Sequence, residues 1–147
     1  MNIKIVCIGK LKNQALKQLC DELLKRLSRL EVIELKEVKG ESIEKIKAKE
    51  YEQFKTFLEK DTHSILLSEH GKNYTTEQFH TTITKISSET LTFFVCGPYG
   101  PAENLKKEVK TILSLSAMTY THEQALYMLL EQLYRHQCLC RGKEYGK

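Results

Sequence analysis

The feature that most constrains the fold of this chain is a repeated alternation of short β-branched runs with longer segments of helical periodicity. Residues 2–9 (NIKIVCIG) are rich in isoleucine and end at a glycine, which predicts a strand. Residues 13–30 then place leucines at helical spacings on an otherwise polar segment, which predicts an amphipathic helix. By the same criteria we predict further strands at 32–38, 64–68, 90–96 and 112–116, and helices at 42–58, 76–86, 103–110 and 122–138.

This alternation predicts the fold class. Strands that are separated by helices pair in parallel, and the helices cover both faces of the sheet. Residues 65–67 and 93–95 are apolar without alternation, which is typical of strands buried on both sides. The chain has 147 residues, 41% of them hydrophobic and 29% charged, which suits one domain with one core. We therefore predict a single α/β domain over residues 1–147, with a parallel sheet between two helical layers.

Composition excludes several classes of protein. The longest apolar runs, such as residues 91–96, are far shorter than the roughly 20 residues that a membrane-spanning helix needs. No cleavage site follows the opening strand, so we expect a cytoplasmic protein with no membrane partner. The five cysteines then indicate reduced thiols, and Cys138 and Cys140 have no second pair to complete a zinc site, so we expect no metal. The net charge of +4 permits an anionic partner without requiring one.

Three predicted strand ends carry residues suited to binding a ligand. In an open parallel sheet, ligands bind beyond the carboxyl ends of the strands. These ends are followed by residues 67–72 (LSEHGK), 96–101 (CGPYGP) and 114–122 (SLSAMTYTH). The second segment lacks the spacing of dinucleotide or phosphate loops, so it is either a backbone approach to another ligand or an ordinary turn. We expect a pocket over residues 97–101 and 114–122.

The last predicted helix joins this pocket to a basic tail. Thr121 followed by Gln124 matches a capping box, which places His122 in the first helical turn, where it either accepts a proton or packs. The helix is apolar on more than one face, which indicates a core position together with a subunit interface. Cations surround Tyr145 in the tail and suit RNA phosphates and bases, the alternative being a solvated terminus.

Taken together, these segments resemble the RlmH (YbeA) family of SPOUT-class RNA methyltransferases. The resemblance covers the whole chain and rests on three motifs in a fixed order. They are residues 97–100 (GPYG), residues 114–122 (SLSAMTYTH), and residues 129–135 (LLEQLYR) followed by 141–147 (RGKEYGK).

The resemblance implies a SPOUT-type domain whose C-terminal part forms a trefoil knot. It implies a cytoplasmic homodimer that uses S-adenosyl-L-methionine to methylate N3 of a pseudouridine in 23S ribosomal RNA of the large subunit. Carried over by motif, the cofactor-binding positions are Leu67, Gly97, Ser116, Ala117, Met118, Thr119, Tyr120 and Thr121. The candidates for handling the N3 proton are His122, His136 and Tyr145. The candidates for contacting RNA are Arg135, Arg141, Lys143, Tyr145 and Lys147.

The chain departs from the family pattern at four positions. It has Cys96 in place of a glycine, Thr121 in place of a proline, Leu126 in place of an arginine, and Gly146 in place of a histidine. These departures motivate a second hypothesis, a non-catalytic ribosome-binding or assembly protein that has kept the knotted dimer. A third, a small-molecule α/β enzyme, requires the order of the motifs to be coincidental.

Overall fold

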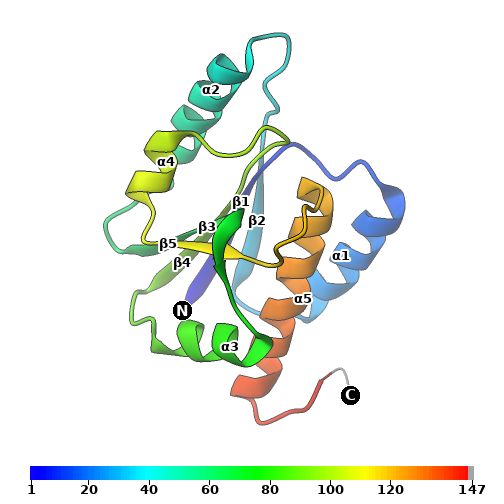
Figure 1. The fold of residues 1–147 in the computed structure, drawn as a ribbon. Coiled ribbons are helices and arrows are strands. Elements are labelled where there is room, and N and C mark those ends of the chain that lie inside the picture. The colour runs from blue at the N-terminus through cyan, green and yellow to red at the C-terminus, as the bar shows by residue number, and fades with distance from the viewer. Residues whose placement is uncertain (146–147) are drawn as a thin grey trace.

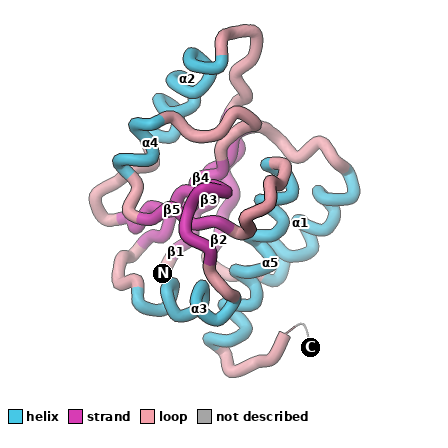
Figure 2. Tube along the Cα trace, in the orientation of Figure 1, coloured by secondary structure: helices cyan, strands magenta, loops and turns pink. Residues whose placement is uncertain are grey.

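The computed structural model describes residues 1–145 of the chain. Its strands are β1 (Asn2–Ile8), β2 (Leu30–Leu35), β3 (Thr62–Asn73), β4 (Thr90–Val95) and β5 (Thr111–Ser114). Its helices are α1 (Gln14–Arg26), α2 (Ile43–Lys55), α3 (Thr76–Lys85), α4 (Glu103–Glu108) and α5 (His122–Cys140). The strands form one sheet in the order β2-β1-β4-β3-β5, and every neighbouring pair is parallel (Figure 1, Figure 2). The predicted α/β class is confirmed.

Helices cover both faces of this sheet (Figure 1). Consecutive strand residues point to opposite faces, so Ile5 and Phe93 join one core while Val6 and Phe94 join the other. The first core is completed by apolar residues of α1, α3 and α5, and the second by residues of α2 and α4. The predicted arrangement of a sheet between two helical layers is therefore confirmed. None of the helices within residues 1–145 is long and apolar enough to cross a membrane.

Side-chain caps mark the start of the helices α1, α2, α3 and α5, whereas α4 has none. The predicted capping box of α5 is present: Thr121 accepts from the Gln124 backbone N–H, and Gln124 accepts from that of Thr121. α1 ends at Arg26, earlier than predicted, because the chain turns through Arg29 at a φ of 53° and enters β2.

The predicted end of the third strand at residue 68 is wrong, because β3 continues to Asn73. Its pairing with β5 is interrupted: Leu67 and Lys72 both face Leu113, so the residues between them bulge out of the ladder. Gly71 closes this bulge against β5, where a Cβ atom would lie 2.7 Å from the carbonyl carbon and oxygen of Ile112. Only glycine permits that approach of two backbones.

The register of the sheet brings the three predicted loops together. Leu67 pairs with Val95 of β4 on one side and with Leu113 of β5 on the other. The segments that follow Val95 and Leu113 therefore leave the sheet on either side of Leu67, at the same edge.

Candidate functional site

A cavity of about 780 Å³ opens at this carboxyl edge of the sheet. Most of its lining comes from three segments, namely residues 67–70 of β3, residues 95–101 after β4, and residues from 115 to 125 after β5. Lys47 of α2 and Lys106 of α4 complete the lining. This volume lies within the range of small-molecule and cofactor sites. The residues predicted to bind the cofactor all line the cavity except Ala117, which is exposed in the same loop.

The glycine loop after β4 rests on a buried carboxyl group. The backbone N–H of Gly97 donates to Oε1 of Glu50, on α2, at 3.4 Å, and a Cβ atom at Gly97 would lie 2.9 Å from Oε2. Glu50 is only 4% exposed. This burial raises the pKa of its carboxyl, and the hydrogen bond from the Gly97 N–H partly opposes the rise. Glycine at position 97 therefore lets the loop lie directly on the carboxyl.

Sequence reasoning missed Glu50, because it lies in a segment that looks like a solvated charged face. The available signal was spacing: Ile46, Glu50 and Phe54 are four residues apart, so they share one helix face, and all three are buried. A carboxyl on the apolar stripe of an amphipathic helix is unusual and calls for a partner.

The structure accommodates Cys96, the side chain that the family pattern lacks. Cys96 packs with Tyr51, Phe54 and Leu105 in the core between the sheet and α2 and α4. Burial raises the pKa of the Cys96 thiol to about 12. The thiol is therefore protonated and belongs to the core.

The loop after β5 is held by its own hydroxyl groups. Ser114 Oγ donates to the Ser116 carbonyl at 2.6 Å, and the Met118 backbone N–H donates to Ser116 Oγ at 3.0 Å. Thr119 donates to the carboxylate of Glu69 on the bulge of β3, which joins two of the lining segments. Met118 remains 76% exposed, so an apolar side chain stands open at the rim of the cavity.

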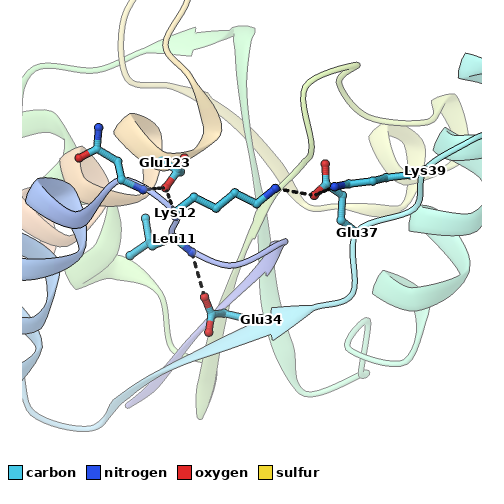
Figure 3. A network of polar contacts seen from close by, with 7 residues as sticks. Leu11, Lys12, Glu34, Glu37, Lys39 and Glu123 are labelled. Atoms are coloured by element: carbon cyan, nitrogen blue, oxygen red, sulfur yellow. Dashed lines mark hydrogen bonds and ion pairs between the residues drawn. The ribbon is translucent and has the colours of Figure 1, made fainter.

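A polar network fixes the start of α5 beside the cavity (Figure 3). Glu123 Oε1 accepts from the backbone N–H groups of Lys12 and Asn13, at 2.5 and 3.0 Å. Lys12 also pairs with Glu37 at 3.5 Å, and Lys39 pairs with the same carboxylate oxygen at 3.7 Å. These two hydrogen bonds lower the pKa of the Glu123 carboxyl, and the bond from the Asn13 N–H has the larger effect.

Of the three proton-handling candidates, only His122 lines this cavity. His136 lies on the same helix about 21 Å further along, at a rise of about 1.5 Å per residue, and is buried. Burial, and then the neighbouring His80, lower the pKa of His136 to about 4. Tyr145 lies beyond the end of α5, where its hydroxyl donates to Glu131 at 3.0 Å. His136 and Tyr145 thus lie outside the cavity of their own chain.

The basic tail is partly engaged within the molecule. Arg135 pairs with Glu131 at 3.0 Å, and its guanidinium carbon lies 4.7 Å from the centre of the Tyr145 ring. Arg141 is exposed and donates to Ser28 Oγ at 3.0 Å, and Lys143 is exposed. Lys147 and Gly146 lie outside the described residues. Of the four predicted RNA-contacting residues that the structure describes, Arg141 and Lys143 are exposed, whereas Arg135 and Tyr145 are half-buried.

Leu126, which stands where the family pattern has an arginine, belongs to the core and does not line the cavity. Its side chain packs in the core formed by α1, α3 and α5, and the residue is 4% exposed. A residue buried this way does not contact a ligand in the cavity.

The fold and the cavity define a parallel α/β protein with a cofactor-sized site at the carboxyl edge of its sheet. The chain belongs to the SPOUT methyltransferase family, because the family described as "Predicted SPOUT methyltransferase" matches residues 1–146. The predicted resemblance is confirmed by curated relatives that carry the name ribosomal RNA large subunit methyltransferase H. The relative from Flavobacterium johnsoniae is 37% identical over 99% of this chain and 98% of its own length. The relative from Dictyoglomus thermophilum is 38% identical over 99% of both chains.

A solved structure supports the fold alone. It is that of a probable methylase family protein from Haemophilus influenzae Rd KW20, with a TM-score of 0.59 and 11% sequence identity. The match covers 96% of this chain and 66% of that one.

Proposed function

We propose that this protein transfers a methyl group from S-adenosyl-L-methionine to ribosomal RNA of the large subunit, at N3 of a pseudouridine in 23S RNA. The observation that carries the proposal is the convergence of three strand-end segments on one cavity of about 780 Å³. The names of the curated relatives supply the RNA substrate. With this substrate we also propose a cytoplasmic homodimer whose C-terminal part is knotted.

The residues around the cavity fit the proposed cofactor. Gly97 lines the cavity in a loop that rests on Glu50, and Ser116 and Thr119 line it from the loop after β5. We assign the cofactor contacts to these residues together with Leu67, Met118, Tyr120 and Thr121. When bound there, the cofactor supplies an electrophilic methyl group on a sulfonium centre, so the protein's main task is to align that group with a nucleophile.

His122 is our candidate for the proton that the nucleophile must lose. N3 of pseudouridine is an imide nitrogen, which attacks only after deprotonation, and a positioned base accelerates such a step. His122 lies in the first turn of α5 on the cavity wall, and the network around Glu123 fixes that turn. We propose that His122 Nδ1 or Nε2 takes the N3 proton.

The tail suits a role in a second subunit. Tyr145 and the exposed Arg141 lie at the far end of α5 from the cavity of their own chain. We propose that in the homodimer they reach the cavity of the partner, so that one subunit binds the cofactor and the other helps to hold the RNA.

The test is methyl incorporation. Purified protein with radiolabelled S-adenosyl-L-methionine is incubated with ribosomes that lack the mark, and the modified nucleotide is located by mass spectrometry. The proposal expects one methyl group per large subunit, at a pseudouridine, and none with Gly97→Val. No incorporation by protein that binds the cofactor in calorimetry would overturn the catalytic proposal.

Leu126 favours a second candidate function, because the family's arginine is replaced by a side chain that is buried in the core. A non-catalytic protein would bind the ribosome and show no incorporation in the same experiment. Sedimentation with large subunits separates this candidate from a protein that does neither.

A further inference from the structure

Three side chains able to bind a metal converge where α3 meets the C-terminal end of α5. His136 and Cys140 are four residues apart on α5, so they share one face of that helix, and His80 comes from α3. One nitrogen of each imidazole and the Cys140 Sγ all lie within 4.8 Å of one another. Among the residues that the structure describes, this is the one group of three or more histidine, cysteine or acidic side chains close enough to share an ion.

One pair of atoms already has the spacing of ligands in a tetrahedral metal site. Bond lengths of about 2.05 Å to nitrogen and 2.3 Å to sulfur place these two kinds of zinc ligand about 3.6 Å apart. Cys140 Sγ lies 3.7 Å from His136 Nε2. His80 contacts the other nitrogen of that ring, since its Nδ1 lies 2.8 Å from His136 Nδ1. One ion binds only one nitrogen of an imidazole, so an ion held by His136 Nε2 and Cys140 Sγ requires the half-buried His80 ring to turn away from His136 Nδ1 and toward the ion.

The three residues differ in how freely they can adjust. His136 is buried and fixed in the core, whereas Cys140 is exposed on the last turn of α5 and can rotate toward it. Cys7, Cys20, Cys96 and Cys138 are buried, so Cys140 is the cysteine that can reach an ion without opening the core.

We propose that His80, His136 and Cys140 form a zinc-class metal site, with water as the fourth ligand, that ties α3 to the C-terminal end of α5. Two imidazoles with one thiolate favour zinc over the hard cations magnesium and calcium. The site lies about 21 Å from His122 along α5, so it is outside the cavity of its own chain. From the spacing of Cys138 and Cys140 we expected no metal. The cluster is not visible in the sequence because its two histidines lie 56 residues apart in the chain.

Cobalt(II) provides the test, because it takes zinc sites and reports its ligands by absorption. The full-length protein is stripped of metal under reducing conditions and titrated with Co²⁺, and Zn²⁺ is then added. We expect one equivalent of cobalt, a thiolate-to-cobalt charge-transfer band in the near ultraviolet, the visible bands of a tetrahedral ion, and loss of all these bands on adding Zn²⁺.

Matched variants locate the site. Cys140→Ser is expected to abolish the near-ultraviolet band, and His80→Ala to weaken binding at least about 10-fold, since even indirect contacts to a metal have effects of that size. The controls are Cys138→Ser and His70→Ala, which change a cysteine and an exposed histidine outside the cluster. They are expected to leave the near-ultraviolet band and the cobalt affinity unchanged. His80→Gln repeats the test should His80→Ala not fold, as judged by circular dichroism. The proposal is overturned if the wild type gives no thiolate band, or if Cys140→Ser and His80→Ala bind cobalt like the wild type. Either result would show that His80 and His136 form a hydrogen-bonded pair without a metal.

Discussion

At the scale of single residues, the glycine loop and the carboxyl beneath it form one unit. Gly97 has no room for a side chain, because Glu50 Oε2 would lie 2.9 Å from its Cβ atom. We predict that Gly97→Val lowers the affinity for S-adenosyl-L-methionine at least about 10-fold, a loss of about 1.4 kcal/mol, because the loop must lift from the carboxyl. Titration calorimetry measures this, with Ala15→Ser, exposed on α1 and outside the cavity lining, as the control. An unchanged Kd would place the cofactor elsewhere.

The same carboxyl makes stability depend on pH. Burial raises the pKa of Glu50 above its ordinary value of 4.5, so the folded state binds its proton more tightly than the unfolded state does. The stability from this group is complete below pH 4.5 and is lost as the pH rises through the raised pKa. Glu50→Gln keeps an oxygen for the Gly97 N–H and removes the ionisation. Urea unfolding is therefore expected to show the variant more stable than the wild type at pH 8, with the difference shrinking toward pH 4.5. An equal difference at both pH values would show that Glu50 does not titrate in this range.

At the scale of helices and strands, the sequence predicts those features that neighbouring residues determine. The β-branched run of β1 and the Thr121 capping box are both encoded by neighbouring residues, and both are found as predicted. The extension of β3 to Asn73 depends instead on a contact between Gly71 and Ile112, which are far apart in the chain. The three loops of the cavity were predictable because ligands bind beyond the carboxyl ends of parallel strands. Spacing could place Glu50 on a buried helix face but could not identify its partner, because Gly97 approaches it only in the folded sheet.

The bulge of β3 can be tested at Gly71. A Cβ atom there would lie 2.7 Å from backbone atoms of Ile112, which cannot move without disturbing β5. We predict that Gly71→Ala lowers the free energy of unfolding by about 2 kcal/mol, in the range of overpacked sites. Denaturant unfolding measures the loss, and Asn73→Ala, exposed at the end of the same strand, serves as the control. A change of less than 0.5 kcal/mol, the scale of ordinary surface substitutions, would show that the two strands separate easily.

At the scale of the whole molecule, α5 runs from the cavity at its first turn to the tail at its last. The net charge of +4 says little about where RNA binds, since Arg135 is already paired with Glu131. The proposed function includes a second subunit, because Tyr145 in the tail lies at the far end of α5 from the cavity of its own chain. The cavity of one chain and the tail of the other would form each complete site.

Mixed dimers test this arrangement. One variant, Gly97→Val, has a damaged cavity and an intact tail, and the other, ending at Gly142, has an intact cavity and no tail. Each homodimer is expected to be inactive. After unfolding and refolding at equal concentrations, half of the dimers carry one of each chain, and each of these holds one complete site. Methyl transfer should therefore return to about a quarter of the wild-type rate. If the truncated homodimer keeps full activity, or if mixing restores nothing while sedimentation shows mixed dimers, the tail does not serve the cavity of its partner.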